Sequence, residues 1–133
     1  MNMHGDIKSV VLKGTVSAYS GNGRGLGYPT ANIGAQTDLD DGVYFGLADL
    51  GEYKSHPALI FIGTPTTVGD RDRRVEAHLL DITDIDYYGL GLRLNILHYH
   101  RPSKTFNSVD ELTKYMKQDE KTGRAWFKKR DTN

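Results

Sequence analysis

The stretch Arg74-Val-Glu-Ala-His-Leu-Leu-Asp81 alternates between apolar and polar residues along most of its length. Successive side chains of a β-strand point to opposite faces, so one face of this segment is apolar and the other carries Glu76 and His78. A carboxylate in the middle of such a strand is either an outward-facing, solvated charge or a functional group. The pattern predicts a strand, and Glu76 is the residue on it to which chemistry could be assigned.

Further segments with strand character lie on both sides of this stretch. Residues 58–62 are a continuous apolar run, which suits a strand buried on both faces. Residues 90–97 alternate, which places the even-numbered residues from Leu90 to Ile96 on the inward face. The predicted strands are residues 10–16, 42–48, 58–62, 74–81 and 90–97. Strands at short intervals, without helices between them, predict an antiparallel barrel or sandwich.

One helix is predicted near the C-terminus. Ser108-Val-Asp-Glu111 has the spacing of a capping box, and apolar residues from Leu112 to Met116 follow at helical spacing. Gly123 is expected to end or interrupt the helix. Trp126-Phe127 suggests that the tail packs back on the strands, and the basic residues around it are interpreted as a solvated tail.

Four of the 15 glycines fall at alternate positions between Gly21 and Gly27, in the loop after the first predicted strand. Such a loop lets the backbone approach a ligand closely and can bind an anion through consecutive N–H groups. Arg24 adds forked donors that suit phosphate oxygens. The spacing fits neither a Walker A loop nor a dinucleotide fingerprint. A phosphate-binding loop and a simple connection between strands therefore both remain open.

The next residues, Tyr28-Pro-Thr-Ala-Asn32, carry two neutral oxygen groups. If the chain is extended here, Thr30 and Asn32 point to the same side. A hydroxyl and an amide oxygen beside a phosphate loop suit Mg²⁺, which takes few ligands from protein and more from phosphate and water. The alternative is a polar edge strand that hydrogen-bonds its neighbours.

These segments together resemble the riboflavin kinase family, which transfers the γ-phosphate of ATP to the ribityl 5′-hydroxyl of riboflavin to give FMN. The resemblance covers residues 10–119 and rests on several motifs in the family's order. They are Gly27-Tyr-Pro-Thr-Ala-Asn-Ile33, Gly42-Val-Tyr-Phe-Gly46, Ile62-Gly-Thr-Pro-Thr66, Val75-Glu-Ala-His-Leu-Leu-Asp81, Tyr87-Tyr-Gly89 and Arg101-Pro-Ser-Lys-Thr-Phe106. The family fold implies a six-stranded antiparallel Greek-key barrel with a C-terminal α-helix.

The resemblance also implies a role for individual residues. Glu76 would be the catalytic base, and Thr30 and Asn32 would bind Mg²⁺ as well as the nucleotide. The remaining nucleotide-binding residues implied are Gly21, Gly23, Arg24, Gly27 and His78. The implied flavin-binding residues are Arg101, Lys104 and Phe106. The small-molecule partners would be ATP or ADP and riboflavin or FMN. A non-catalytic barrel that binds flavin or nucleotide is the alternative.

Composition narrows the remaining possibilities. Seventeen Lys and Arg balance 17 Asp and Glu, for a net charge of zero, which argues against nucleic acid as a partner. There is no Cys and no apolar leader or membrane-length segment. We expect one domain over residues 1–133, monomeric and cytoplasmic, without membrane partners. Few residues precede the first predicted strand, so the adenylyltransferase module that many bacterial relatives carry is not expected.

Overall fold

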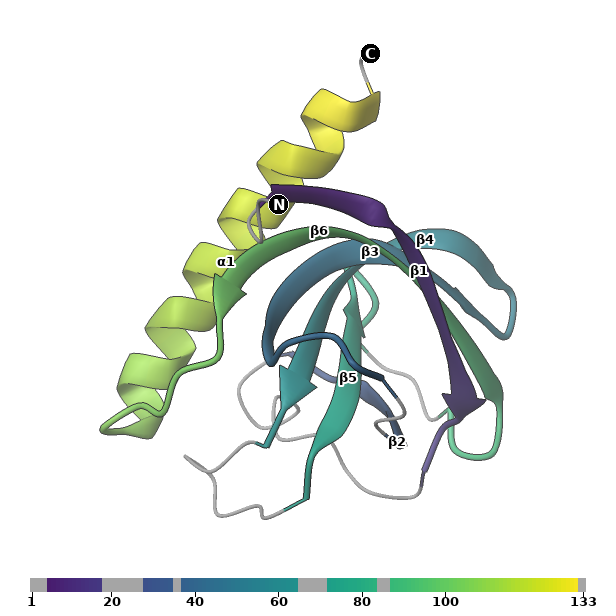
Figure 1. Ribbon diagram of the computed structural model, residues 1–133, viewed down its shortest axis with the longest axis horizontal. Coiled ribbons are helices and arrows are strands. Elements are labelled where there is room, and N and C mark those ends of the chain that lie inside the picture. Colours follow the sequence, from purple (N-terminus) through teal and green to yellow (C-terminus); the bar gives the residue numbers. More distant parts are fainter. Residues whose placement is uncertain (1–4, 18–27, 35–36, 65–71, 84–86, 132–133) are drawn as a thin grey trace.

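The structure is a computed structural model and describes residues 5–17, 28–34, 37–64, 72–83 and 87–131. Within these ranges the chain forms a curved sheet of six strands and one long helix (Figure 1). The elements are β1 (Gly5–Thr15), β2 (Ala31–Gly34), β3 (Gly42–Leu50), β4 (Tyr53–Gly63), β5 (Arg74–Leu79), β6 (Gly91–Pro102) and α1 (Val109–Asp131).

The sheet is antiparallel throughout, in the order β1-β6-β3-β4-β5-β2. Its two edge strands approach each other, and just beyond β1 the backbone N–H of Ser17 donates to the carbonyl of Asn32 at 2.9 Å. Gly14 allows this approach, because a Cβ atom there would lie 2.9 Å from the Ile33 Cβ. The predicted six-stranded barrel with a C-terminal helix is therefore confirmed, with one correction. The sheet is barrel-like and its seam between β1 and β2 is not closed by a strand ladder.

The interior of the curved sheet holds the main hydrophobic core. The apolar face of β5 points into it, as the alternation of that strand predicts. The inward residues of β6 from Leu92 to Ile96 are buried there too. Leu90 is a correction, because it precedes β6 and is 43% exposed. At that point the chain is still in the turn that enters the strand, where the strand's alternation does not apply.

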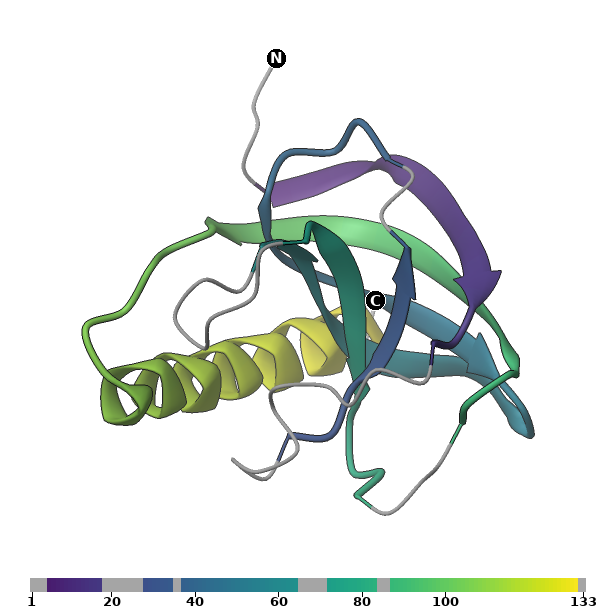
Figure 2. The ribbon, with the colours of Figure 1, turned by 90° about the horizontal axis from the view of Figure 1, so that it is seen from below.

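A second core lies between the sheet and α1, which runs along the outside of the strands (Figure 2). It contains Phe45, Leu59, Leu80 and Phe127, with Trp126 packed against it. The tail therefore packs back on the sheet as predicted. The second face of β5 is also buried, which the alternating pattern does not reveal.

Helix α1 begins where the capping box places it. The backbone N–H of Glu111 donates to the Ser108 hydroxyl at 3.1 Å. The expectation that Gly123 ends or interrupts the helix is wrong, since α1 continues to Asp131. Gly123 is buried, and a Cβ atom there would lie 2.7 Å from Leu59 Cδ2. Glycine is therefore placed here for close contact between helix and sheet. No helix among the described residues is long and apolar enough to cross a membrane.

Candidate active site

The pairing of β2 with β5 brings together three of the residues to which the sequence assigns chemistry. Asn32 and Glu76 are direct partners in the antiparallel ladder, so their side chains share a face. The Thr30 hydroxyl donates to Glu76 Oε1 at 3.4 Å. Ala31 and Ile33 point the other way, into the barrel core. The prediction that Thr30 and Asn32 point to the same side is therefore confirmed.

This group of oxygen ligands is largely removed from solvent. Glu76 is 8% exposed and Asn32 is 3% exposed. Buried carboxylates are rare unless they are paired or functional, so burial contradicts the interpretation of Glu76 as a solvated surface charge. A hydroxyl, an amide and a carboxylate on one face supply hard oxygen donors, which fit a divalent cation of the Mg²⁺ type. Among the described residues, no group of three His, Asp or Glu side chains could hold a metal ion alone.

His78 lies two residues along β5 from Glu76 and secures the segment that leads into β2. Its Nδ1–H donates to the Pro29 carbonyl at 2.8 Å, and its ring contacts that of Tyr28 edge-on at 5.3 Å between centroids. Burial lowers the pKa of His78, so the ring stays neutral near pH 7. His78 thus fixes the backbone beside Thr30.

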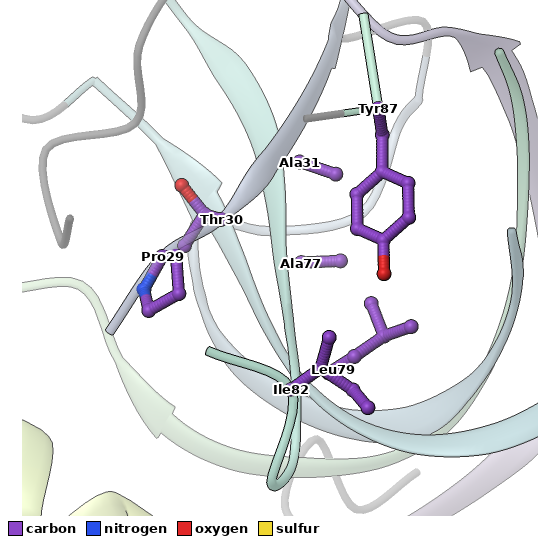
Figure 3. A pocket seen from close by; sticks show the side chains of 7 residues that line it. All are labelled: Pro29, Thr30, Ala31, Ala77, Leu79, Ile82 and Tyr87. Atoms are coloured by element: carbon purple, nitrogen blue, oxygen red, sulfur yellow. The ribbon is translucent and has the colours of Figure 1, made fainter. Parts of the chain in front are cut away.

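The opposite, inner side of the same two strands lines a pocket (Figure 3). The pocket is partly open, with about 260 Å³ of space that includes solvent outside it, and Tyr87 projects its hydroxyl into it. Burial raises the pKa of that phenol, so it is neutral at physiological pH. The Thr30 hydroxyl points away from the Tyr87 ring (Figure 3). The pocket lining is Pro29, Thr30, Ala31, Ala77, Leu79, Ile82 and Tyr87.

The residues implied for flavin binding lie at the end of β6 and just after it, and they meet the first half of α1. The Lys104 ammonium lies 5.4 Å from the centroid of the Phe106 ring, and the Arg101 guanidinium lies 5.8 Å from it. Phe106 is 8% exposed. The structure therefore brings these three residues into one cluster. The four loop residues implied for phosphate binding, Gly21, Gly23, Arg24 and Gly27, lie outside the described residues.

Arg101 is held by a residue to which the sequence analysis assigned no role. Asp119 of α1 is 1% exposed and accepts two hydrogen bonds from Arg101, from Nε and Nη2, both at 2.7 Å. His100 Nε2 donates to the same carboxylate at 3.1 Å. Burial alone would raise the pKa of Asp119, but these hydrogen bonds outweigh it and hold the pKa below its usual value. Asp119 shares the buried stripe of the helix with Met116, Gly123 and Phe127, and a carboxylate on an apolar stripe was the signal available in the sequence.

A second polar contact joins α1 to the turn that follows β5. Arg124 pairs with Glu120 at 2.8 Å and with Asp81 at 2.7 Å. Glu120 also accepts a hydrogen bond from Tyr28. Burial, with a smaller contribution from this hydrogen bond, raises the pKa of Tyr28 to about 12. The spacing of Glu120 and Arg124, four apart on a helix, indicates an ion pair, but the sequence does not reveal its third member.

Comparison with known proteins identifies the family. The family model described as Flavokinase: Riboflavin kinase matches residues 7–127. The chain is 33% identical over 123 residues to the trifunctional protein RibF/MnmA of Mycoplasmoides gallisepticum, covering 90% of this chain and 18% of that protein. It is 32% identical over 108 residues to human riboflavin kinase, covering 74% of this chain and 70% of that one.

A solved structure agrees with the sequence comparisons. The crystal structure of riboflavin kinase from Trypanosoma brucei superposes with a TM-score of 0.69 at 24% identity, over 92% of this chain and 79% of that one, which supports the fold. The chain thus spans less than a fifth of one relative and more than two thirds of another. Since the family model covers nearly its whole length, the chain belongs to the riboflavin kinase family.

Proposed function

We propose that this protein is a riboflavin kinase, which transfers the γ-phosphate of ATP to the 5′-hydroxyl of riboflavin and releases FMN and ADP. The observation that carries the proposal is the arrangement of Thr30, Asn32 and Glu76 on one buried face of the β2–β5 pair. Phosphoryl transfer needs positioning, charge neutralisation and an acceptor for the hydroxyl proton. This face offers an acceptor and oxygen ligands side by side.

Glu76 is assigned as the general base. Its carboxylate accepts the proton of the ribityl 5′-hydroxyl as that oxygen forms a bond to the γ-phosphorus, and the bond from phosphorus to the β–γ bridging oxygen breaks. The Thr30 hydroxyl donates to one oxygen of this carboxylate at 3.4 Å. The side chain is buried, so water competes little for the same oxygen atoms.

Thr30 and Asn32 would hold a divalent cation, for which we propose Mg²⁺, through the hydroxyl and the amide oxygen. When bound, the cation neutralises negative charge on the phosphates of ATP. His78 keeps the Pro29–Thr30 segment in place by its hydrogen bond to the Pro29 carbonyl. As a neutral ring it adds no charge of its own to the nucleotide side of the site.

The two substrates would occupy opposite ends of this arrangement. ATP or ADP would lie beneath the glycine loop, and riboflavin or FMN against the cluster of Arg101, Lys104 and Phe106, where cation and ring contacts are already present. A single domain, a monomeric state, a cytoplasmic location and the lack of a nucleic-acid partner stay predictions.

The test is FMN formation from riboflavin, ATP and Mg²⁺, resolved by chromatography. Glu76→Gln should lower kcat by about 10²- to 10⁴-fold, the usual contribution of a general base, while riboflavin still binds. Glu52→Gln, at an exposed turn, is the matched control and should retain wild-type turnover. Full activity of Glu76→Gln would contradict the assignment. Flavin binding by the wild type without ATP consumption would favour the non-catalytic barrel instead.

A further inference from the structure

The three residues proposed for flavin binding share a neighbour, Tyr115 of α1. The Lys104 ammonium lies 4.3 Å from the centroid of the Tyr115 ring and donates to its hydroxyl at 3.0 Å. The Phe106 ring is 4.9 Å from it, with 53° between the planes, and the Arg101 guanidinium is 5.4 Å away. Tyr115 therefore lies at the centre of this cluster, while the sequence indicates only that it lies on one face of the helix.

The polar donors of Arg101 are directed away from this cluster. Two of its nitrogens donate to Asp119 and the third to the Pro102 carbonyl. The guanidinium therefore meets Phe106 and Tyr115 only through cation–ring contacts. The two rings beside Arg101 are the surfaces that a planar ligand can contact.

Lys104 covers Tyr115, and a ligand can replace its contacts with the ring. Its side chain is 45% exposed, and its other charged neighbour, Glu111, lies at 3.7 Å and is 32% exposed. Exposed ion pairs of this kind contribute little to stability. The long, flexible side chain can leave the ring at small cost, and the half-buried Tyr115 then offers an aromatic face beside Phe106.

We propose that Tyr115 is a further flavin-binding residue, whose ring stacks on the isoalloxazine ring when the flavin displaces Lys104. The proposal rests on the proposed function, because that function names the ligand. The isoalloxazine ring is planar and electron-poor and the phenol ring is electron-rich, so the two stack favourably. The aromatic side chain, not the hydroxyl, is the part of Tyr115 that the flavin requires.

Titration of riboflavin against the full chain, followed by the quenching of flavin fluorescence, tests this directly. Tyr115→Leu should raise the Kd for riboflavin about tenfold, the loss expected from removing one stacked ring, and should weaken the quenching. Tyr115→Phe keeps the ring and should stay within about twofold of the wild type. Lys117→Ala, an exposed change on the same helix, is the control and should leave the Kd unchanged.

An unchanged Kd in Tyr115→Leu would overturn the proposal. An equal loss in Tyr115→Phe would also overturn it, since that result assigns binding to the hydroxyl. If Tyr115→Leu does not fold, Tyr115→Gln replaces it, because glutamine is a good helix former at a partly exposed position. Measuring FMN formation distinguishes a failure of the proposed kinase activity from a failure of the proposed role of Tyr115. A wild type that makes FMN while Tyr115→Leu binds flavin normally refutes only the role of Tyr115, and a wild type that makes no FMN refutes the kinase.

Discussion

The strongest stability prediction concerns Asp119→Asn. The wild-type carboxylate accepts three charge-assisted hydrogen bonds, two from Arg101 and one from His100, at a position that is 1% exposed. Asparagine has nearly the same size but only one acceptor oxygen, and its amide would face donors. At least one N–H group then loses its partner, and the guanidinium loses its counter-charge.

Breaking a buried ion pair from one side typically costs about 3–5 kcal/mol, and the oxygen that asparagine retains places this variant at the lower end, about 3 kcal/mol. For a domain of this size, each kcal/mol corresponds to a change of about 3–5 °C in melting temperature. Asp119→Asn should therefore melt about 10 °C below the wild type at pH 7. The exposed Asp131→Asn, at the end of the same helix, is the control and should melt with the wild type.

The pH dependence of this difference supplies a second readout. The folded-state pKa of Asp119 lies below the unfolded value of 3.8, so its contribution is complete above that value and is lost as pH falls through the folded pKa. Melting followed by circular dichroism should show a constant gap between wild type and Asp119→Asn from pH 7 to about pH 4, and a shrinking gap below it. A variant that melts within 2 °C of the wild type at pH 7, or a gap that does not change with acid, would refute the reasoning.

Three further variants test other parts of the structure. Gly123→Leu should lower the free energy of unfolding by about 1–3 kcal/mol in chemical denaturation, because a Cβ there already lies 2.7 Å from Leu59 Cδ2; unchanged stability would contradict the close helix contact. The wild type should lose stability as pH falls below 6.5, because burial lowers the pKa of His78 in the folded chain and only the unfolded chain then takes up a proton there. In chemical denaturation at several pH values, His78→Gln should not show this loss of unfolding free energy. The same dependence on pH in variant and wild type would contradict the reasoning. Thr30→Val should raise the KM for MgATP about tenfold and leave the KM for riboflavin unchanged in the kinase assay; the reverse pattern would remove Thr30 from the nucleotide site.

Local periodicity predicts the strands because each one buries an apolar face against the others. The alternation of 74–81 identifies the inward face of β5, and the capping box at Ser108 identifies the first turn of α1. The sequence of a single strand does not show what packs against its outer face. The burial of Glu76 and His78 on that face is therefore not visible in the pattern, and neither is the continuation of the helix through Gly123.

The candidate site also has a part that the sequence predicts and a part that it does not. The relation of Thr30 to Asn32 follows from the geometry of one extended segment, so the sequence predicts it. The pairing of Asn32 with Glu76 depends on the register between two strands that are far apart in the chain, and only the resemblance to a family suggests it. Asp119 carries a local signal, a carboxylate on the buried stripe of the helix, but the sequence does not identify its partners, because they lie on another element.

Helix α1 links the two candidate half-sites through consecutive residues. Asp119 binds Arg101 on the flavin side, while Glu120 pairs with Arg124, which in turn reaches Asp81 at the end of the strand that carries the proposed base. Neighbouring residues on a helix point in directions about 100° apart, so one turn can make both sets of contacts at once. A helix that only covered apolar surface would need neither ion pair. The polar residues of α1 therefore indicate that its position relative to the ends of β5 and β6, and not burial alone, is what this part of the sequence specifies.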